Sequence, residues 1–274
     1  MSKIRVAAIQ ILKEETKEKN LEKAYKLAKE AANKEVDIIC LPEKWNIKGG
    51  DPFKDAEDEN GPSIKCLERI ACENGVYVLG GSIWETQDKK YYNTSRLFDR
   101  NGNCIGVHKK IHLYKFEKMI FTPGTKLEPC KTEFGKVGMT VCFDLAFPEV
   151  SRILTLKGAD IIFNPAFIPA SGLENWHIYL KARALENRIP IVAINAVSNE
   201  RGETWSGSSL IIDFKEGYES PSKLELTQAS SKEEIITANL NLDYTRKIRE
   251  IRLSERSEID KKIFKNLKFI NEKA

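Results

Sequence analysis

Cys142 is the residue of this chain whose type and position point most directly to chemistry. It follows the β-prone run Gly138 to Val141 and precedes Pro148, which suits the first turn of a helix that Gly158 can end. The sequence therefore predicts Cys142 in a short turn between a strand and a helix. Such a turn can lift a thiol out of the sheet and into a pocket, whereas a structural cysteine is expected inside the strand. The position favours a nucleophile without establishing one.

Two other residues with acid–base or hydrogen-bonding side chains follow predicted strands. Glu43 comes after the apolar run 36–41 and a proline, and Asn164 follows the apolar residues 161–163. In α/β folds, functional groups collect at the edge of the sheet where the parallel strands end. We therefore expect Glu43, Cys142 and Asn164 to meet at one edge, with the polar segment 107–124 between them in the sequence.

In this order and spacing, the chain resembles the nitrilase superfamily of carbon–nitrogen hydrolases over nearly its whole length. The matching motifs are Leu-Pro-Glu at 41–43, Lys-Lys-Ile-His-Leu at 109–113, Val-Cys-Phe-Asp at 141–144 followed by Pro-Glu at 148–149, Asn-Pro at 164–165, and Arg-Ala-Leu-Glu-Asn at 183–187. The resemblance implies an α/β fold, a four-layer α-β-β-α sandwich. It also implies a catalytic triad at the matching positions Glu43, Lys110 and Cys142.

Further site residues are expected around this triad. Glu117 matches a second glutamate that many family members place beside the lysine, in a segment that matches less distinctively than the triad motifs. Two carboxylates around Lys110 should keep it charged even in a partly buried pocket. We also expect Phe143, Asn164 and Phe167 to bind the substrate.

The chemistry of these groups agrees with the roles that the resemblance implies. A thiol with a pKa near 8.5 is mostly protonated at neutral pH, so a base, here Glu43, must prepare the attacking thiolate of Cys142. Lys110 and the backbone N–H of Phe143 would stabilise the oxyanion, and one such donor is typically worth roughly 3–4 kcal/mol. Ammonia or an amine leaves, and water hydrolyses the thioester that remains.

The main hypothesis is a cofactor-free amidohydrolase that acts on a small non-peptide amide, with an ω-amidase of dicarboxylate monoamides as first choice. A nitrilase or an N-carbamoyl hydrolase is the alternative within the family. A Cys–His dyad would need one of three histidines as base, and only His112 is a plausible one, although it is better suited to orienting the Lys110 loop. A non-catalytic scaffold with the same fold is the remaining alternative. No metal site or disulfide is expected, because the six cysteines form no Cys-x-x-Cys pair.

The elements that must position these residues are read from hydrophobic periodicity and turn signals. Strands are predicted at about 3–10, 36–41, 76–79, 92–98, 104–108, 207–213 and 234–240, helices at about 17–33 and 62–74, and further strand–helix units over 137–158, 160–188 and 190–195. The Asn-Gly pair at 101–102 is a strong hairpin signal. We expect one domain over 1–274, with an elaborated surface connection at 215–234 and a polar, helical tail from about 243.

Charge and hydropathy limit the partners. The chain has 44 Lys and Arg against 40 Asp and Glu, giving +4, and the basic residues are scattered among acidic ones. A nucleic-acid partner is therefore not expected, and the basic stretch Lys261 to Lys268 is interpreted as a solvated face. No apolar run approaches the roughly 18 residues that span a bilayer, and the start of the chain leads directly into a strand, so a cytoplasmic protein without membrane partners is expected. The family resemblance further implies homo-oligomers built from dimers, joined through helices 148–157 and 175–188.

Overall fold

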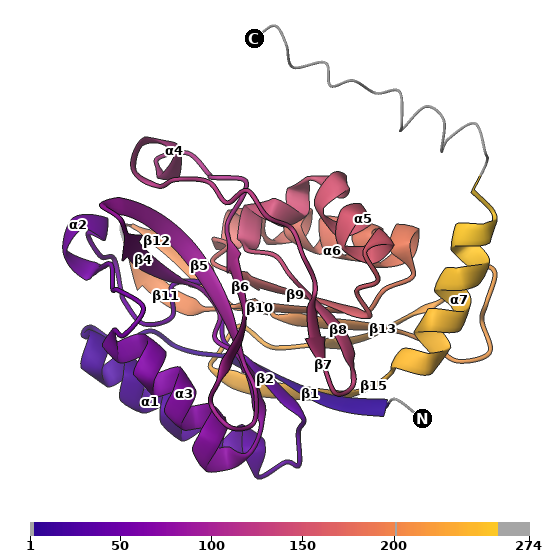
Figure 1. Cartoon of the computed structure of the whole chain (residues 1–274), viewed down its shortest axis with the longest axis horizontal. Helices are drawn as coiled ribbons and strands as arrows, with labels where there is room; N and C mark the ends of the chain where they lie inside the picture. Colours follow the sequence, from indigo (N-terminus) through magenta and orange to yellow (C-terminus); the bar gives the residue numbers. More distant parts are fainter. Residues whose placement is uncertain (1–2, 201, 257–274) are drawn as a thin grey trace, which may run out of the picture.

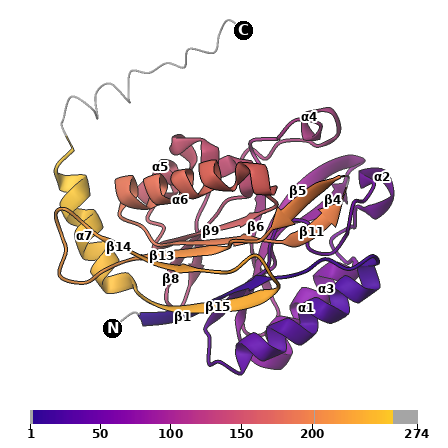
Figure 2. The ribbon, with the colours of Figure 1, turned by 180° about the vertical axis from the view of Figure 1, so that it is seen from behind.

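Two β-sheets lie face to face, with helices on the outer face of each, in the computed structural model of the chain (Figures 1 and 2). The structure describes residues 3–200 and 202–256. Helices α1 (Lys17–Ala32) and α3 (Pro62–Asn74) cover the first sheet, and α5 (Pro148–Leu156) and α6 (Leu173–Asn187) cover the second. The predicted four-layer α-β-β-α sandwich is confirmed.

The first sheet holds seven strands in the order β15-β1-β2-β3-β5-β4, with β6 paired to β5. Their bounds are Lys3–Gln10 (β1), Ile38–Cys40 (β2), Tyr77–Leu79 (β3), Ile83–Gln87 (β4), Lys90–Phe98 (β5), Cys104–Lys109 (β6) and Glu234–Asn241 (β15). β1, β2 and β3 run parallel, so their carboxyl ends meet at one edge. This is the edge from which the Glu43 segment leaves β2.

The second sheet holds six strands in the order β14-β13-β10-β9-β8-β7. Their bounds are Cys130–Thr132 (β7), Gly135–Met139 (β8), Ile161–Ala166 (β9), Ile191–Asn195 (β10), Leu210–Phe214 (β13) and Leu224–Gln228 (β14), and a separate ribbon pairs β11 (Val197–Glu200) with β12 (Glu203–Ser206). β8, β9 and β10 run parallel. The Cys142 segment follows β8 and Phe167 follows β9, whereas Asn164, expected after a strand, lies inside β9.

The core follows the two-residue period of the strands. In β1, Val6 and Ala8 pack into the layer between the two sheets, whereas Ala7 and Ile9 pack against the outer helices. Strands β9 and β10 divide in the same way between the inner layer and helices α5 and α6. Burial on both faces explains why these parallel strands are nearly continuous apolar runs in the sequence.

Helix ends are set by local signals. Thr16 caps α1 through its side chain, and a proline opens α3 while Gly75, with φ of 61°, ends it. The remaining helices are α2 (Pro52–Asp55), α4 (Glu117–Ile120), α7 (Leu242–Ser254) and two 3₁₀ turns, η1 (Cys142–Ala146) and η2 (Ala170–Gly172). No helix in residues 3–200 and 202–256 is long and apolar enough to cross a membrane.

Most predicted elements are present, but strands β4 and β7 and the short helices α2 and α4 were not predicted, and other regions differ as well. The surface connection predicted at 215–234 contains strand β14, and the β11–β12 ribbon was not predicted. The predicted helical segment from about 243 corresponds to α7, but this helix is not polar throughout, because Leu242 and Ile248 are buried. The basic stretch Lys261 to Lys268 lies outside the described residues.

Candidate active site

The turn that carries Cys142 has a backbone conformation unusual for its residue type. Strand β8 ends at Met139, two residues earlier than the sequence suggests, and Cys142 opens the 3₁₀ turn η1 with φ of 48°. A non-glycine residue in the left-handed region costs on the order of 1–3 kcal/mol and is often found at functional sites. The prediction that Cys142 lies between a strand and helix α5 is confirmed.

Lys110 is buried between two carboxylates. Its Nζ lies 2.9 Å from Oε1 of Glu43 and 2.8 Å from Oε2 of Glu117. Desolvation lowers the pKa of Lys110, but the negative charges of Glu43 and Glu117, joined by that of Cys142 when it ionises, outweigh it and hold the pKa well above its usual value. The ammonium therefore stays charged although its side chain is buried.

Asn93 is a member of this cluster that the sequence did not single out. Its Nδ2 donates to Oε1 of Glu43 at 2.7 Å and to Oε1 of Glu117 at 3.1 Å. The backbone carbonyl oxygen of Asn93 accepts from the backbone N–H of Lys110 at 2.8 Å. Asn93 thus ties both carboxylates and the lysine to strand β5. In the sequence, the only sign of this role is an amide side chain within a predicted strand.

The Cys142 thiol meets Glu43 and the Phe167 backbone. Burial raises the pKa of the thiol well above its usual value, and the charge of Glu43, which accepts a hydrogen bond from the thiol, raises it further. The charge of Lys110 and a hydrogen bond from the backbone N–H of Phe167 act in the opposite direction without reversing the shift. The thiol is therefore protonated in the resting site, and its proton lies next to a carboxylate.

Asp144 joins the Cys142 turn to the Lys110 loop. Its Oδ1 accepts from the backbone N–H groups of Ile111 and His112 at 3.1 and 2.8 Å, and its Oδ2 accepts from that of Val141 at 3.0 Å. Nε2 of His108 lies 2.9 Å from Oδ2. Burial acts to raise the pKa of Asp144, but the hydrogen bonds with His108 and His112 hold it well below its usual value. In the sequence this residue was only part of a motif.

Asn164, predicted to bind substrate, is fully buried and engaged within the protein. Its Nδ2 donates to Oγ1 of Thr140 at 2.9 Å and to the carbonyl oxygen of Cys142 at 3.4 Å, and its Oδ1 accepts from Nε1 of Trp176 at 3.0 Å. We revise the prediction accordingly and propose that Asn164 supports the Cys142 turn. Arg183 supports the same turn from α6, because its guanidinium donates to the backbone carbonyl oxygens of Leu145 and Ala146 in η1.

The two predicted phenylalanines are half-buried beside the site. Phe143 packs edge-on against the rings of Tyr114 and Phe147. Phe167 stacks on Trp205, with ring centroids 4.5 Å apart. Both residues therefore combine a backbone group next to the thiol with an apolar surface.

The histidines have other partners. The hydrogen bonds described for His108 and His112 go to Asp144, and Nε2 of His177 lies 2.8 Å from the carbonyl oxygen of Ser208. His112 also stacks on Phe147 at 3.8 Å. These contacts favour a structural role over a Cys–His dyad. Among the described residues, no group of three or more His, Cys, Asp or Glu could hold a metal ion.

Known proteins match this chain over nearly its whole length. The carbon–nitrogen hydrolase family model matches residues 5–250. Omega-amidase NIT2 of Xenopus tropicalis is 32% identical over 264 residues, covering 91% of this chain and 93% of the relative. The crystal structure of Nit3 from Saccharomyces cerevisiae, a member of the nitrilase superfamily, has a TM-score of 0.83 at 27% identity and covers 94% of this chain and 96% of Nit3. A carbon–nitrogen hydrolase from Helicobacter pylori has a TM-score of 0.80 at 25% identity, covering 94% and 96%.

Proposed function

Because the chain belongs to the carbon–nitrogen hydrolase family of the nitrilase superfamily, we propose that it is an amidase that cleaves a small non-peptide amide through a thioester on Cys142. One observation carries this proposal. A protonated thiol, an acceptor carboxylate and a buried ammonium converge on one site from three different strand ends. These are the nucleophile, base and oxyanion partner that acyl transfer requires.

The first half of the reaction uses Glu43 as base. As Sγ of Cys142 attacks the amide carbon, its proton passes to Glu43, and the carbonyl oxygen becomes an oxyanion beside Lys110 and the backbone N–H of Phe143. Glu43 then returns the proton to the departing nitrogen, so ammonia leaves and the thioester forms. Because burial and Glu43 both raise the pKa of the thiol, the thiolate is made at the moment of attack and does not accumulate beforehand.

The second half removes the acyl group. A water molecule enters where ammonia left, gives a proton to Glu43 and attacks the thioester carbon. The C–S bond then breaks, Glu43 returns the proton to Sγ of Cys142, and the carboxylic acid leaves. Glu117 binds Lys110 through Oε2, 2.8 Å from Nζ, and its Oε1 shares the Asn93 amide with Glu43. This arrangement keeps the cation in place while Glu43 exchanges its proton.

The proposed substrate class rests on the relatives and on the half-buried side chains of Phe143 and Phe167. Several relatives at about 32% identity are omega-amidases, and the chain covers more than nine-tenths of them. We therefore propose monoamides of short dicarboxylic acids as the substrates. We further propose one catalytic domain that works as a homo-oligomer built from dimers, in which exposed apolar side chains of α5 and α6 meet a second copy.

Trapping the thioester tests the proposed mechanism. The protein is mixed with succinamate, quenched in acid after milliseconds to seconds, and digested for peptide mass analysis. The proposal expects the Cys142 peptide to gain the mass of the substrate less ammonia. A matched Cys142→Ala protein should show no adduct, and the exposed Cys72 serves as an internal control for non-specific acylation. Turnover without any adduct on Cys142 would contradict the proposal.

A further inference from the structure

A second charged cluster adjoins the catalytic residues and has no part in the proposed chemistry. Lys44 directly follows Glu43, and its Nζ lies 4.9 Å from the centroid of the Phe167 ring and 5.2 Å from that of the Trp84 ring. The backbone N–H of Phe167 donates to the Cys142 thiol. Phe167 therefore contacts the Cys142 thiol through its backbone and the Lys44 ammonium through its ring.

Backbone hydrogen bonds fix the position of the segment that carries Lys44. Lys44 has φ of 54°, and its N–H donates to the carbonyl oxygen of Ser82 at 2.7 Å. The N–H of Glu43 donates across to Ala166, next to Phe167, at 3.3 Å. The proposed base and the neighbouring cation are thus carried by one hydrogen-bonded segment that links the two sheets.

Lys13 and Glu200 complete the cluster. Oε1 of Glu200 lies 2.8 Å from Nζ of Lys13, and its Oε2 lies 3.4 Å from Nζ of Lys44 and accepts from the backbone N–H of Gly49 at 2.6 Å. Nζ of Lys13 also lies 3.8 Å from the centroid of the Phe167 ring. Two ammonium groups therefore converge on one aromatic ring and share one carboxylate.

Burying Lys13 close to a second lysine costs free energy. Desolvation and then the charge of Lys44 lower the pKa of Lys13 to about 7, against the opposing effect of Glu200. Buried charges of this kind stabilise a fold poorly and are common at functional sites. An ammonium close to the thiol is what the free carboxylate of an anionic substrate would need.

Exposure separates the roles of the two lysines. The side chain of Lys13 is 0% exposed and that of Lys44 is 11% exposed. Lys44 is thus the more exposed of the two lysines, and its Nζ also donates to the carbonyl oxygen of Gly49 at 3.0 Å. Glu200 holds the Lys44 ammonium, and Lys13 pairs with the other oxygen of Glu200 and contacts the Phe167 ring.

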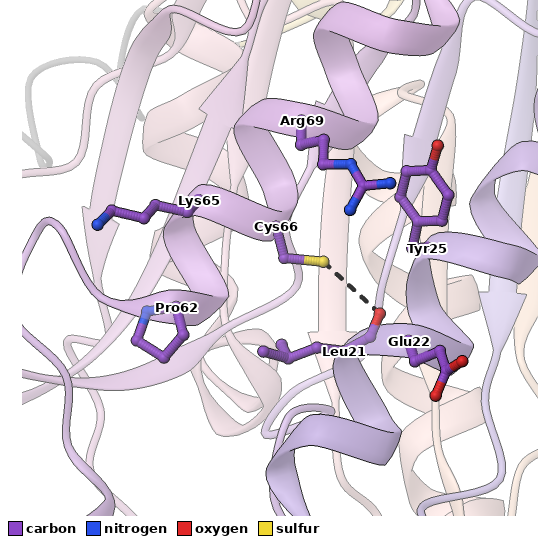
Figure 3. A pocket seen from close by; sticks show the side chains of 7 residues that line it. All are labelled: Leu21, Glu22, Tyr25, Pro62, Lys65, Cys66 and Arg69. Atoms are coloured by element: carbon purple, nitrogen blue, oxygen red, sulfur yellow. Dashed lines mark hydrogen bonds between the residues drawn. The ribbon is translucent and has the colours of Figure 1, made fainter.

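The hollow between α1 and α3 offers no comparable chemistry. It measures about 550 Å³ and is lined by Leu21, Glu22, Tyr25, Pro62, Lys65, Cys66 and Arg69 (Figure 3). Burial raises the pKa of the Cys66 thiol to about 11, and its Sγ contacts the carbonyl oxygen of Leu21 at 3.6 Å. None of the proposed catalytic residues lines it.

We propose that Lys44 binds the free carboxylate of the substrate, with Lys13 and Glu200 as positioning residues. This inference rests on the proposed amidase function and specifies how the site selects a dicarboxylate monoamide. The amide carbon sits at Cys142, and the distal carboxylate lies beside the Phe167 ring in a charge-assisted hydrogen bond with the Lys44 ammonium. A short chain of methylene groups joins the two ends.

Two substrates of matched length test the assignment. Succinamate and butyramide differ in that one ends in a carboxylate and the other in a methyl group. The measured quantity is the ratio of their kcat/KM values in the wild type and in Lys44→Met, Lys44→Arg and Lys48→Met proteins. Lys48 is the matched control, because it lies four positions away and pairs with Glu15.

The proposal expects the ratio to fall roughly tenfold to a hundredfold in Lys44→Met, mainly through KM for succinamate. Lys44→Arg should keep most of the preference, and Lys48→Met should keep all of it. An unchanged ratio in Lys44→Met would overturn the proposal while leaving the amidase function standing.

Binding supplies a readout that does not depend on turnover. Succinamate is titrated calorimetrically into Cys142→Ala and into Cys142→Ala/Lys44→Met proteins, with thermal unfolding of both as a check on folding. Binding to the first that weakens at least tenfold in the second supports the role of Lys44. Equal binding to both contradicts it. If the wild type releases no ammonia from either amide, the amidase proposal fails, and the calorimetric result alone then decides whether Lys44 binds the carboxylate.

Discussion

Nζ of Lys110 lies 2.9 Å from Oε1 of Glu43, although 67 positions separate the two residues in the chain. The contact joins the loop after β6 to the segment after β2, and Asn93 braces both groups from β5. Removing one partner of such a buried pair typically costs about 3–5 kcal/mol, because the other charge is left uncompensated. The pair therefore couples the stability of the site to its chemistry, and variants must be checked for folding as well as for activity.

Glu43→Gln should separate catalysis from thiol reactivity. The proposed base is lost, so ammonia release should fall by roughly 10²–10⁴. The Cys142 pKa should also fall, because the negative charge that raises it is removed while the positive charge of Lys110 remains. Alkylation of Cys142 by iodoacetamide, followed by peptide mass against pH, should therefore shift to lower pH. Glu59→Gln, at an exposed position, is the control.

An alkylation profile that stays the same in Glu43→Gln would mean that the two groups do not interact in solution.

Asp144→Asn should weaken both the fold and the site. Loss of the charged acceptor between His108 and His112 should lower the free energy of unfolding near pH 7 by about 2–3 kcal/mol. The folded-state pKa of Asp144 lies below its unfolded value of about 3.9. Its contribution is thus fully present above that value and is lost as the pH falls below it. Urea unfolding of the wild type and the variant should begin to converge as the pH falls below about 4, and the convergence should continue towards the lower folded-state pKa.

The exposed Asp58→Asn variant should show no such convergence. A difference between wild type and Asp144→Asn that is constant with pH would show that the carboxylate charge does not matter.

Lys13 should make stability rise on the alkaline side. Its folded pKa is lowered to about 7, whereas an unfolded lysine titrates near 10.4. Between these values the unfolded chain binds one more proton, so the free energy of unfolding should rise with pH from about 7 to 10, by a few kcal/mol in order of magnitude. Lys13→Met should remove this slope, and the exposed Lys19→Met should retain it. Chemical unfolding at several pH values checks this, and a slope that survives in Lys13→Met would contradict it.

Ile178→Glu should dissociate the proposed dimer. Apolar side chains of α5 and α6 stay exposed in the single chain, among them Ile153, Leu156, Ile178 and Tyr179. Exposed apolar side chains grouped on neighbouring helices are typical of protein interfaces. Sedimentation at micromolar concentration should show an oligomeric wild type and a monomeric Ile178→Glu protein. Phe53→Glu, at an exposed position of α2, should remain oligomeric, and a monomeric wild type would contradict the prediction.

Local signals explain why much of the fold and the position of Cys142 could be predicted. Continuous apolar runs, the Asn-Gly hairpin and the proline and glycine around α5 each act within a few residues. Strand β14 was missed because it alternates along an edge, with Leu224 and Leu226 among polar neighbours, and resembles a loop in composition. The β11–β12 ribbon was missed because its strands have four residues each and are mostly polar.

Residues whose role depends on distant contacts could not be recognised in the sequence. Asn93 was one polar residue in a predicted strand until the fold placed it against Glu43 and Glu117. Lys44 and Glu200 are 156 positions apart, and only the packing of β11 beside the Glu43 segment brings them together. Asn164 was predicted to bind the substrate because it follows an apolar run in the sequence, but it lies inside β9 and its side-chain amide is bonded within the protein.

Ammonia release by purified wild-type and Cys142→Ala proteins tests the central claim most directly. The panel contains small amides, ω-amides, nitriles and N-carbamoyl amino acids, and thermal unfolding verifies that both proteins are folded. The account predicts release from ω-amides by the wild type and none by Cys142→Ala. Release that persists in folded Cys142→Ala, or none from any amide by the wild type, would contradict it.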